Sequence, residues 1–93
     1  MRLRFYIDPE TGAPHIHNHG VSEAEVEEVL GSAGEDRPGR DGSRVAVGRT
    51  LSGRLLRVIY VPDPEPDGIF VITAYELQRK AASAYRRRRR RKR

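Results

Sequence analysis

Apolar residues alternate with polar ones at the start of the chain and gather into three denser runs further on. Between Arg2 and Ile7, Leu3, Phe5 and Ile7 recur at every second position, which is typical of a strand with one buried face. Three later runs rich in β-branched residues predict more strands, and the last two, the most apolar, are expected at the centre of a sheet. The three runs are Ser43–Thr50, Arg54–Val61 and Ile69–Tyr75, with the first two joined as a hairpin by LSG.

One segment carries both the pattern of a helix and the residues that begin and end one. Ser22 and Glu25 have the spacing of a capping box, with valines on either side that form a hydrophobic staple. An apolar i, i+3, i+4 stripe follows, and Gly31 is a natural stop. The sequence therefore predicts a helix over Glu23–Leu30.

Two further segments are interpreted from their glycine and charge content. Residues 31–43 (GSAGEDRPGRDGS) predict a long, mobile loop. Near the C-terminus an apolar helical stripe runs from Leu77 to Tyr85, but the positions that would continue it are Arg88 and Lys92. Packing of this last helix is therefore expected to end near Tyr85.

The predicted order of elements is β-α-β-β-β-α. This order indicates a small α+β domain in which two helices pack on an antiparallel sheet. Residues 1–85 would form this single domain. Residues 86–93 are eight consecutive basic residues, expected to form a disordered tail or a frayed helix because like charges repel.

Composition excludes several classes of protein. The chain of 93 residues has no cysteine, so it can hold neither a disulfide framework nor a thiolate metal site. No apolar stretch approaches the roughly 20 residues that cross a bilayer. The N-terminus MRLRFYIDPE lacks the apolar core of a signal peptide. We therefore expect a cytoplasmic location and no membrane partner.

Charge is concentrated at the C-terminus. Residues 1–85 hold 10 basic and 13 acidic side chains, a net charge of −3, whereas the whole chain carries +5. Eight clustered cations bind nucleic acid strongly and without sequence preference, and salt weakens that binding. The run contains no aromatic residue, so base stacking and sequence readout are not expected from it. The alternatives are an idle solvated tail and docking on an acidic protein.

Three blocks of the sequence resemble a known family in the same order. They are NHGVSEAEVEEVL, VGRTLSGRLLRVIYV and FVITAYELQRKAASAY, and they are similar to the BrnT-like branch of the RelE/ParE toxin superfamily and its uncharacterised relatives. The resemblance spans about Asn18 to Tyr85. It implies a RelE-like (microbial-RNase-like) fold and the activity of a ribonuclease toxin from a type II toxin–antitoxin pair, inhibited by a small partner protein. Tyr75 stands where BrnT-like proteins commonly have arginine, a departure that concerns activity more than fold.

RNA cleavage without a metal needs three kinds of group. A base takes the proton of the 2′-hydroxyl, cations stabilise the phosphorane, and an acid protonates the 5′-oxygen that leaves. Histidine titrates near neutrality, and the planar guanidinium of arginine matches phosphate oxygens. The candidate catalytic residues are His19, Arg57, Tyr75 and Arg79.

Each candidate also has a structural alternative. His19 would orient the turn before the first helix, and Arg57 would form an ion pair with Glu76 or a helix glutamate, because a charge among apolar neighbours needs a partner. Tyr75 would be an aromatic residue at the edge of the core, and Arg79 would simply be solvated. The candidate nucleic-acid-binding residues are Arg49, Arg54, Lys80, Arg86, Arg87 and Arg88.

The histidines of HIHNHG also allow a metal site to be considered. Alternate residues of an extended segment point the same way, so His15, His17 and His19 would suit Zn²⁺ or Ni²⁺. The sequence shows no obvious further ligands, and neither a metal nor another cofactor is expected.

The leading expectation is a toxin-like ribonuclease that acts on mRNA or ribosome-associated RNA, with a cognate small antitoxin as partner. One alternative is a non-catalytic RNA- or DNA-binding module on the same fold. Another is a gyrase-poisoning toxin of the ParE kind. The sequence leaves open whether the protein forms a homodimer or a toxin–antitoxin hetero-oligomer.

Overall fold

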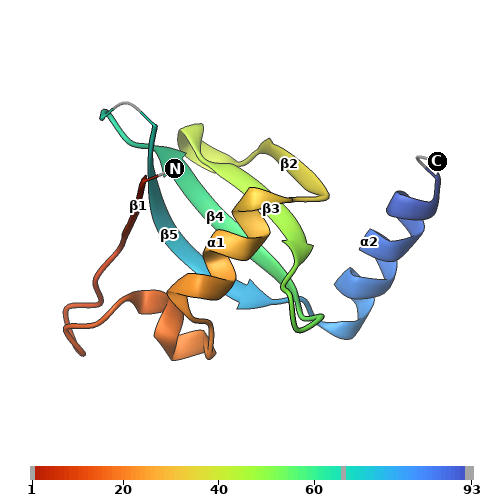
Figure 1. Cartoon of the computed structure of the whole chain (residues 1–93), viewed down its shortest axis with the longest axis horizontal. Helices are drawn as coiled ribbons and strands as arrows, with labels where there is room; N and C mark the ends of the chain where they lie inside the picture. Colours follow the sequence, from red (N-terminus) through yellow and green to blue (C-terminus); the bar gives the residue numbers. More distant parts are fainter. Residues whose placement is uncertain (1, 66, 92–93) are drawn as a thin grey trace.

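The computed structural model describes residues 2–65 and 67–91, and its centre is a twisted five-stranded sheet (Figure 1). The order of the strands is β1-β5-β4-β3-β2. β1 runs parallel to β5, and the other neighbours are antiparallel. The strands are β1 (Arg2–Phe5), β2 (Glu35–Pro38), β3 (Arg44–Arg49), β4 (Leu55–Pro62) and β5 (Gly68–Glu76).

The expectation of an antiparallel sheet is therefore wrong for one pair of strands. After β1 the chain passes through the 3₁₀-helix η1 (His15–His19) and the helix α1 (Glu23–Gly31) to the opposite edge of the sheet. From β2 it then returns strand by strand, so that β5 arrives beside β1 in the same direction. The result is a small α+β domain with a mixed sheet.

The two helices pack on opposite faces of the sheet. Ala46 of β3 belongs to the cluster that α1 buries, whereas the next residue, Val47, packs with Ala82 and Tyr85 of α2 (Arg79–Arg91). Successive residues of a strand point to opposite faces, so α1 and α2 lie on different sides. Figure 1 shows α1 lying across the sheet and α2 standing at one end of it.

The predicted start of α1 is confirmed in atomic detail. The Ser22 hydroxyl accepts a hydrogen bond from the Glu25 backbone N–H, and the Glu25 carboxylate accepts one from the Ser22 backbone N–H. The helix ends one residue later than predicted, because Gly31 is still helical and Ser32 is the C-cap. Val26 and Val29 are fully buried against β3 and β4.

The expectation of a long, mobile loop over residues 31–43 is wrong. This segment contains β2, which pairs with β3, and the 3₁₀-turn η2 (Arg40–Gly42). Asp36 in β2 accepts hydrogen bonds from Arg44 and from the Tyr60 hydroxyl. β2 escaped prediction because it is an edge strand of sequence EDRP with no buried residue, so no apolar alternation marks it.

Both ends of the chain also differ from expectation. β1 stops at Phe5, and Ile7, expected on the buried side, is 49% exposed. At the other end, α2 continues to Arg91, and its contacts with the body do not end near Tyr85 as expected. Arg88 finds a counter-charge in Glu35 of β2, and Arg89 donates to the Gly34 carbonyl. The last two residues of the predicted tail, 92 and 93, lie outside the described residues.

Within the described ranges, no helix is both long and apolar enough to cross a membrane.

Candidate functional site

A cavity of about 310 Å³ lies where η1, the end of β5 and the start of α2 meet. Three of the four predicted catalytic residues line it. The cavity opens on the α2 face of the sheet, because Arg57 in β4 lies opposite Val47 of β3 and Tyr75 of β5. The lining residues are His19, Arg57, Tyr75, Glu76, Leu77, Gln78 and Ala81.

Arg57 lies in the wall of this cavity, without the ion pair that was considered for it. Its guanidinium carbon is 5.9 Å from the centroid of the Tyr75 ring. Its Nε atom is buried and has no hydrogen-bond partner among the described residues. Leaving such a donor unsatisfied costs about 1–3 kcal/mol, and unsatisfied groups of this kind often mark functional sites. The Arg57 side chain is therefore a candidate donor to a ligand in the cavity.

His19 approaches the cavity from η1. Its ring is 5.9 Å from the Tyr75 ring, centroid to centroid, in an edge-to-face arrangement. The position is set by the backbone, because buried Ile16 anchors η1 and Gly20, at φ 69°, ends it. A left-handed residue of this kind is most easily glycine. His19 is exposed, so its imidazole is open to solvent and to a ligand.

Thr73 adds a second unsatisfied group that the sequence analysis missed. Its Oγ1 is buried and has no hydrogen-bond partner in the described part of the chain. Thr73 faces Ile59, and Arg57 faces Tyr75, so Thr73 and Arg57 are diagonal neighbours on one face of the sheet. The sequence signal that could have identified Thr73 is its position as a polar residue within the apolar run IFVITAY.

A row of rings leads away from the cavity across η1. The His15 and His19 centroids are 5.3 Å apart, and the Tyr6 and His15 centroids are 6.1 Å apart. A hydrogen bond of 3.2 Å joins His15 Nδ1 to Asp8. Hydrogen bonds from the Glu10 backbone N–H, from Asn18 and from His15 hold the pKa of the Asp8 carboxyl below its ordinary value.

The histidines do not form the metal site that was considered. Residues 15–19 form a 3₁₀-helix rather than an extended segment, so alternate side chains do not share one direction. His17 instead bonds to Glu23 of α1, and His15 bonds to Asp8. The described residues contain no group of three or more metal-ligating side chains.

Arg54 is engaged in a structural network. It donates to both carboxylate oxygens of Glu25, to Glu76 and to the Gly20 carbonyl. The hydrogen bond to Glu25, followed by that to Glu76, raises the pKa of Arg54. Arg54 thus ties α1, the end of η1 and β5 together, and it does not line the cavity.

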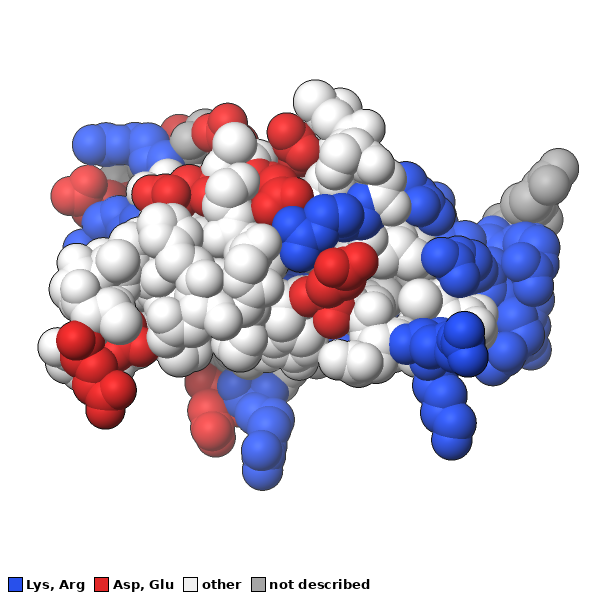
Figure 2. All heavy atoms as spheres, turned by 90° about the horizontal axis from the view of Figure 1, so that it is seen from below, with Lys and Arg blue, Asp and Glu red and all other residues white. Residues whose placement is uncertain are grey.

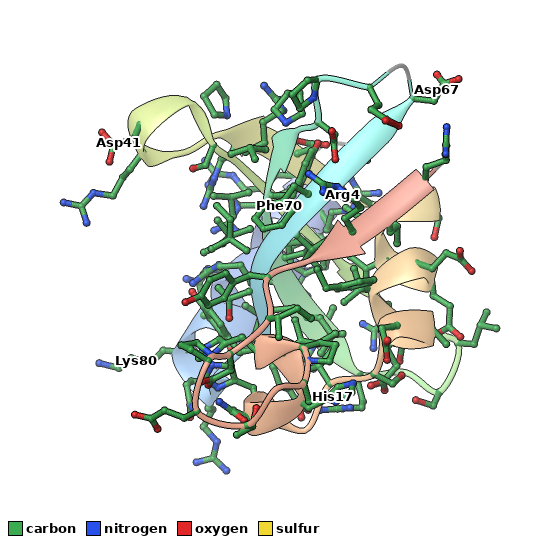
Figure 3. The ribbon with its side chains drawn as sticks, turned by 90° about the vertical axis from the view of Figure 1, so that its left-hand side faces the viewer. Arg4, His17, Asp41, Asp67, Phe70 and Lys80 are labelled. Atoms are coloured by element: carbon green, nitrogen blue, oxygen red, sulfur yellow. The ribbon has the colours of Figure 1, made fainter. Side chains whose placement is uncertain are left out.

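Five of the remaining predicted cations, Arg79, Lys80, Arg86, Arg87 and Arg88, lie along α2. Arg79 and Lys80 are exposed and do not line the cavity, and Lys80 points away from the body of the protein (Figure 3). Arg87 is exposed, while Arg88 is held by Glu35, whose hydrogen bond raises the pKa of Arg88.

A second, basic cavity of about 340 Å³ brings Arg49 of β3 together with α2. Figure 2 shows the arginines gathered over α2, with a broad uncharged surface beside them. Since no acidic residue lines this cavity, it is suited to phosphate groups. Its lining residues are Arg49, Tyr85, Arg86, Arg89 and Arg90.

Comparison with known proteins places the chain in a family. No curated protein and no solved structure matched it. Residues 15–76 match the model of a family described as "Domain of unknown function (DUF4258)". The match covers more than half of the chain and includes His19, Arg57, Thr73 and Tyr75. The chain belongs to the DUF4258 family.

Proposed function

We propose that the protein is a toxin-like ribonuclease on a RelE-like fold, which cleaves RNA without a metal in the cavity formed by His19, Arg57 and Tyr75. The observation that carries this proposal is the buried Nε of Arg57, which has no hydrogen-bond partner in the described part of the chain and lies in a cavity that the His19 imidazole and the Tyr75 phenol also line. A phosphate oxygen would supply the missing acceptor. The resemblance of three sequence blocks to BrnT-like proteins supports the same function.

Each residue of the cavity has a role in the proposed reaction. Arg57, on a central strand, binds the scissile phosphate and stabilises the charge of the phosphorane. His19 takes the proton of the 2′-hydroxyl, whose oxygen then forms a bond to phosphorus. Tyr75 gives its proton to the 5′-oxygen as the bond from phosphorus to that oxygen breaks. The products are a 2′,3′-cyclic phosphate and a 5′-hydroxyl.

Arg79 has a supporting role in this proposal. It follows Gln78, which lines the cavity, and begins α2. Its exposed guanidinium is suited to a neighbouring phosphate of the same strand rather than to the scissile one.

A non-catalytic RNA-binding module is the second candidate, and the basic cavity favours it. Arg49, Arg86, Arg89 and Arg90 offer guanidinium groups there, and the lining includes Tyr85 but no histidine or carboxylate that could serve as a base. Such a site holds phosphates without cleaving the strand. The two candidates differ in whether the RNA remains intact.

Incubation of total RNA with the purified protein in a chelator and at low salt distinguishes these functions. We expect cleavage fragments that end in a cyclic phosphate. Arg57→Ala should lower the rate about 100-fold or more, the usual effect of removing a group that stabilises charge in the transition state. Arg40→Ala, an equal charge change at exposed η2, should keep the wild-type rate.

The opposite outcomes are equally clear. Intact RNA together with a salt-sensitive gel shift favours the binding module. Equal cleavage by the wild type and Arg57→Ala removes Arg57 from the site.

The proposed partner, a small antitoxin, needs a separate test. The protein encoded by an adjacent short reading frame should form a stable complex with this chain and stop cleavage when mixed with it. A neighbouring product that neither binds nor inhibits contradicts this part of the proposal.

A further inference from the structure

The row of rings has two outer members, Tyr6 and His15, that have no role in the proposed chemistry. It runs from Tyr6 through His15 and His19 to Tyr75, with consecutive centroids 6.1, 5.3 and 5.9 Å apart, and ends beside Arg57. The segment after β1, η1, β5 and β4, distant in sequence, contribute residues to it. Rings in sequence with a guanidinium are the arrangement on which proteins stack the bases of single strands.

Core packing does not account for the outer part of the row. Tyr6 is 42% exposed, and the His15 side chain is 33% exposed. The buried residue of η1 is Ile16, which already anchors this segment. Tyr6 and His15 therefore present ring surface to solvent that a planar ligand can cover.

The His15 ring and the backbone that carries Tyr6 are held in place before any ligand arrives. The His15 backbone N–H donates to the Tyr6 carbonyl at 2.9 Å. Asp8 bonds to the His15 ring and accepts from Asn18 at 2.7 Å. A ligand that binds to rings already fixed in this way loses little conformational freedom.

The charge around the outer rings favours a base over a phosphate. The Asp8 carboxylate is within hydrogen-bond distance of the His15 ring, and a carboxylate repels phosphate. Arg57, by contrast, lines the cavity, and the basic cavity is lined by Arg49 and by arginines of α2. An RNA strand would thus place phosphate at Arg57 and an uncharged base over Tyr6 and His15.

We propose that Tyr6 and His15 form a base-binding subsite that stacks one unpaired base of an RNA strand whose phosphate lies at Arg57. The substrate segment must therefore be single-stranded, because a paired base in a duplex keeps its faces against its neighbours. The subsite rests on the proposed function for the location of the phosphate, but its own ligand is the base.

A fluorescent oligonucleotide that cannot be cleaved tests this subsite directly. The probe is a single-stranded 2′-O-methyl RNA with 2-aminopurine at each position in turn, whose fluorescence falls when the base stacks. We expect quenching on binding to the wild type at a particular position. The double variant Tyr6→Leu/His15→Leu, which keeps apolar bulk without rings, should bind about 10-fold to 100-fold more weakly and lose the quenching.

Two controls separate stacking from other effects. Tyr6→Phe keeps the ring and should retain both affinity and quenching. The same probe annealed into a duplex should bind to the arginines without quenching. Thermal unfolding of each variant shows whether the change lies in the site or in the fold, and the single variant His15→Leu repeats the test if the double variant is unfolded.

The outcomes distinguish this subsite from the proposed ribonuclease activity. Ring-dependent quenching supports the subsite even if ordinary RNA remains intact. Intact RNA would contradict the proposed ribonuclease activity but not the subsite. If Tyr6→Leu/His15→Leu cleaves RNA at the wild-type rate and quenching is equal in all variants, the subsite is overturned. The ribonuclease proposal then still stands. An absence of probe binding to the wild type also overturns it.

Discussion

Arg57 of β4 and Arg54, the residue just before β4, have opposite surroundings. Arg54 and Arg57 are three positions apart, so strand alternation directs them to opposite faces of the sheet. Arg54 meets Glu25 and Glu76 and becomes a structural crosslink. Arg57 meets Tyr75 and His19 and keeps a buried Nε without a partner in the described chain. A single property of the backbone thus separates a stabilising arginine from a candidate phosphate ligand.

The Glu25 carboxylate should make stability depend on pH. Its pKa is held below the ordinary value of 4.5, chiefly by the hydrogen bond from the Ser22 N–H and then by Arg54. A lowered folded pKa contributes stability that is present above pH 4.5 and is lost as pH falls through the folded value. Glu25→Gln keeps a capping carbonyl but removes the charge. Its free energy of unfolding should be about 1–2 kcal/mol below wild type at neutral pH.

Urea denaturation at several pH values measures this effect. The wild-type and Glu25→Gln free energies should converge as pH falls below 4.5, because the wild-type carboxylate is then protonated. Glu27→Gln, an exposed change on the same helix, should follow the wild type. A constant difference at all pH values would show that the Glu25 charge is not the cause.

At the scale of elements, α2 depends on β2 for its position. Tyr85 packs beside Gly34 just before β2, Arg88 forms an ion pair with Glu35, and Arg89 donates to the Gly34 carbonyl. This contact orients the arginines of α2 over the end of the sheet. An edge strand without buried residues therefore positions the most basic element of the described chain.

Substitution of Gly34 tests the contact between β2 and α2. A Cβ at Gly34 would overlap the Tyr85 hydroxyl, and little else is as close. We expect Gly34→Ala to lower the free energy of unfolding by about 1–3 kcal/mol, as overpacking does. Adding Tyr85→Phe removes the overlapping oxygen and should restore part of the loss. A double-mutant cycle compares the loss of unfolding free energy from Gly34→Ala in the wild type and in Tyr85→Phe. Equal losses in the two backgrounds would show that the Tyr85 hydroxyl is not the source of the strain.

At the scale of the whole molecule, basic side chains are densest at the end of the long axis where α2 lies. Arginines gather over α2, and much of the face seen in Figure 2 is uncharged or acidic. Asp36, Glu25 and Glu35 neutralise Arg44, Arg54 and Arg88 through ion pairs. Among the described residues, the exposed cations are therefore densest along α2.

Salt dependence of RNA binding measures how many of these cations take part. Arg86→Gln/Arg87→Gln/Arg90→Gln leaves the anchoring residues Arg88 and Arg89 in place. The slope of log affinity against log salt for single-stranded RNA should become shallower by about 2, which is roughly 0.7 for each lost phosphate contact.

A matched variant controls for net charge in that experiment. Arg2→Gln/Arg37→Gln/Arg40→Gln removes three exposed arginines outside α2. Its slope should equal that of the wild type. Equal losses of slope in both variants would mean that binding follows total charge, not the ordered helix.

Much of the fold follows from local chemistry. The capping box of Ser22 and Glu25, the hairpin at LSG and the two apolar strands are properties of short segments, and the structure contains each of them. The candidate residues His19, Arg57 and Tyr75 were also predicted, because imidazole, guanidinium and phenol are recognisable side chains. Their use in catalysis stays a prediction, as does the relation to BrnT-like toxins.

Other features were out of reach because they arise from contacts between distant segments. β2 exists through its pairing with β3, and the ordered end of α2 depends on Glu35. The parallel pairing of β1 with β5 depends on the path of the whole chain. Tyr6 has no local mark of function, and only its neighbours give it one.

The sequence by itself determined the elements and the supply of chemical groups, since periodicity, capping and side-chain identity are local properties. Only the tertiary structure decided which arginine is neutralised, which is left with an unsatisfied donor, and which rings stand in one row. The physical reason is that ion pairing, burial and ring contact depend on distances between residues far apart in the chain.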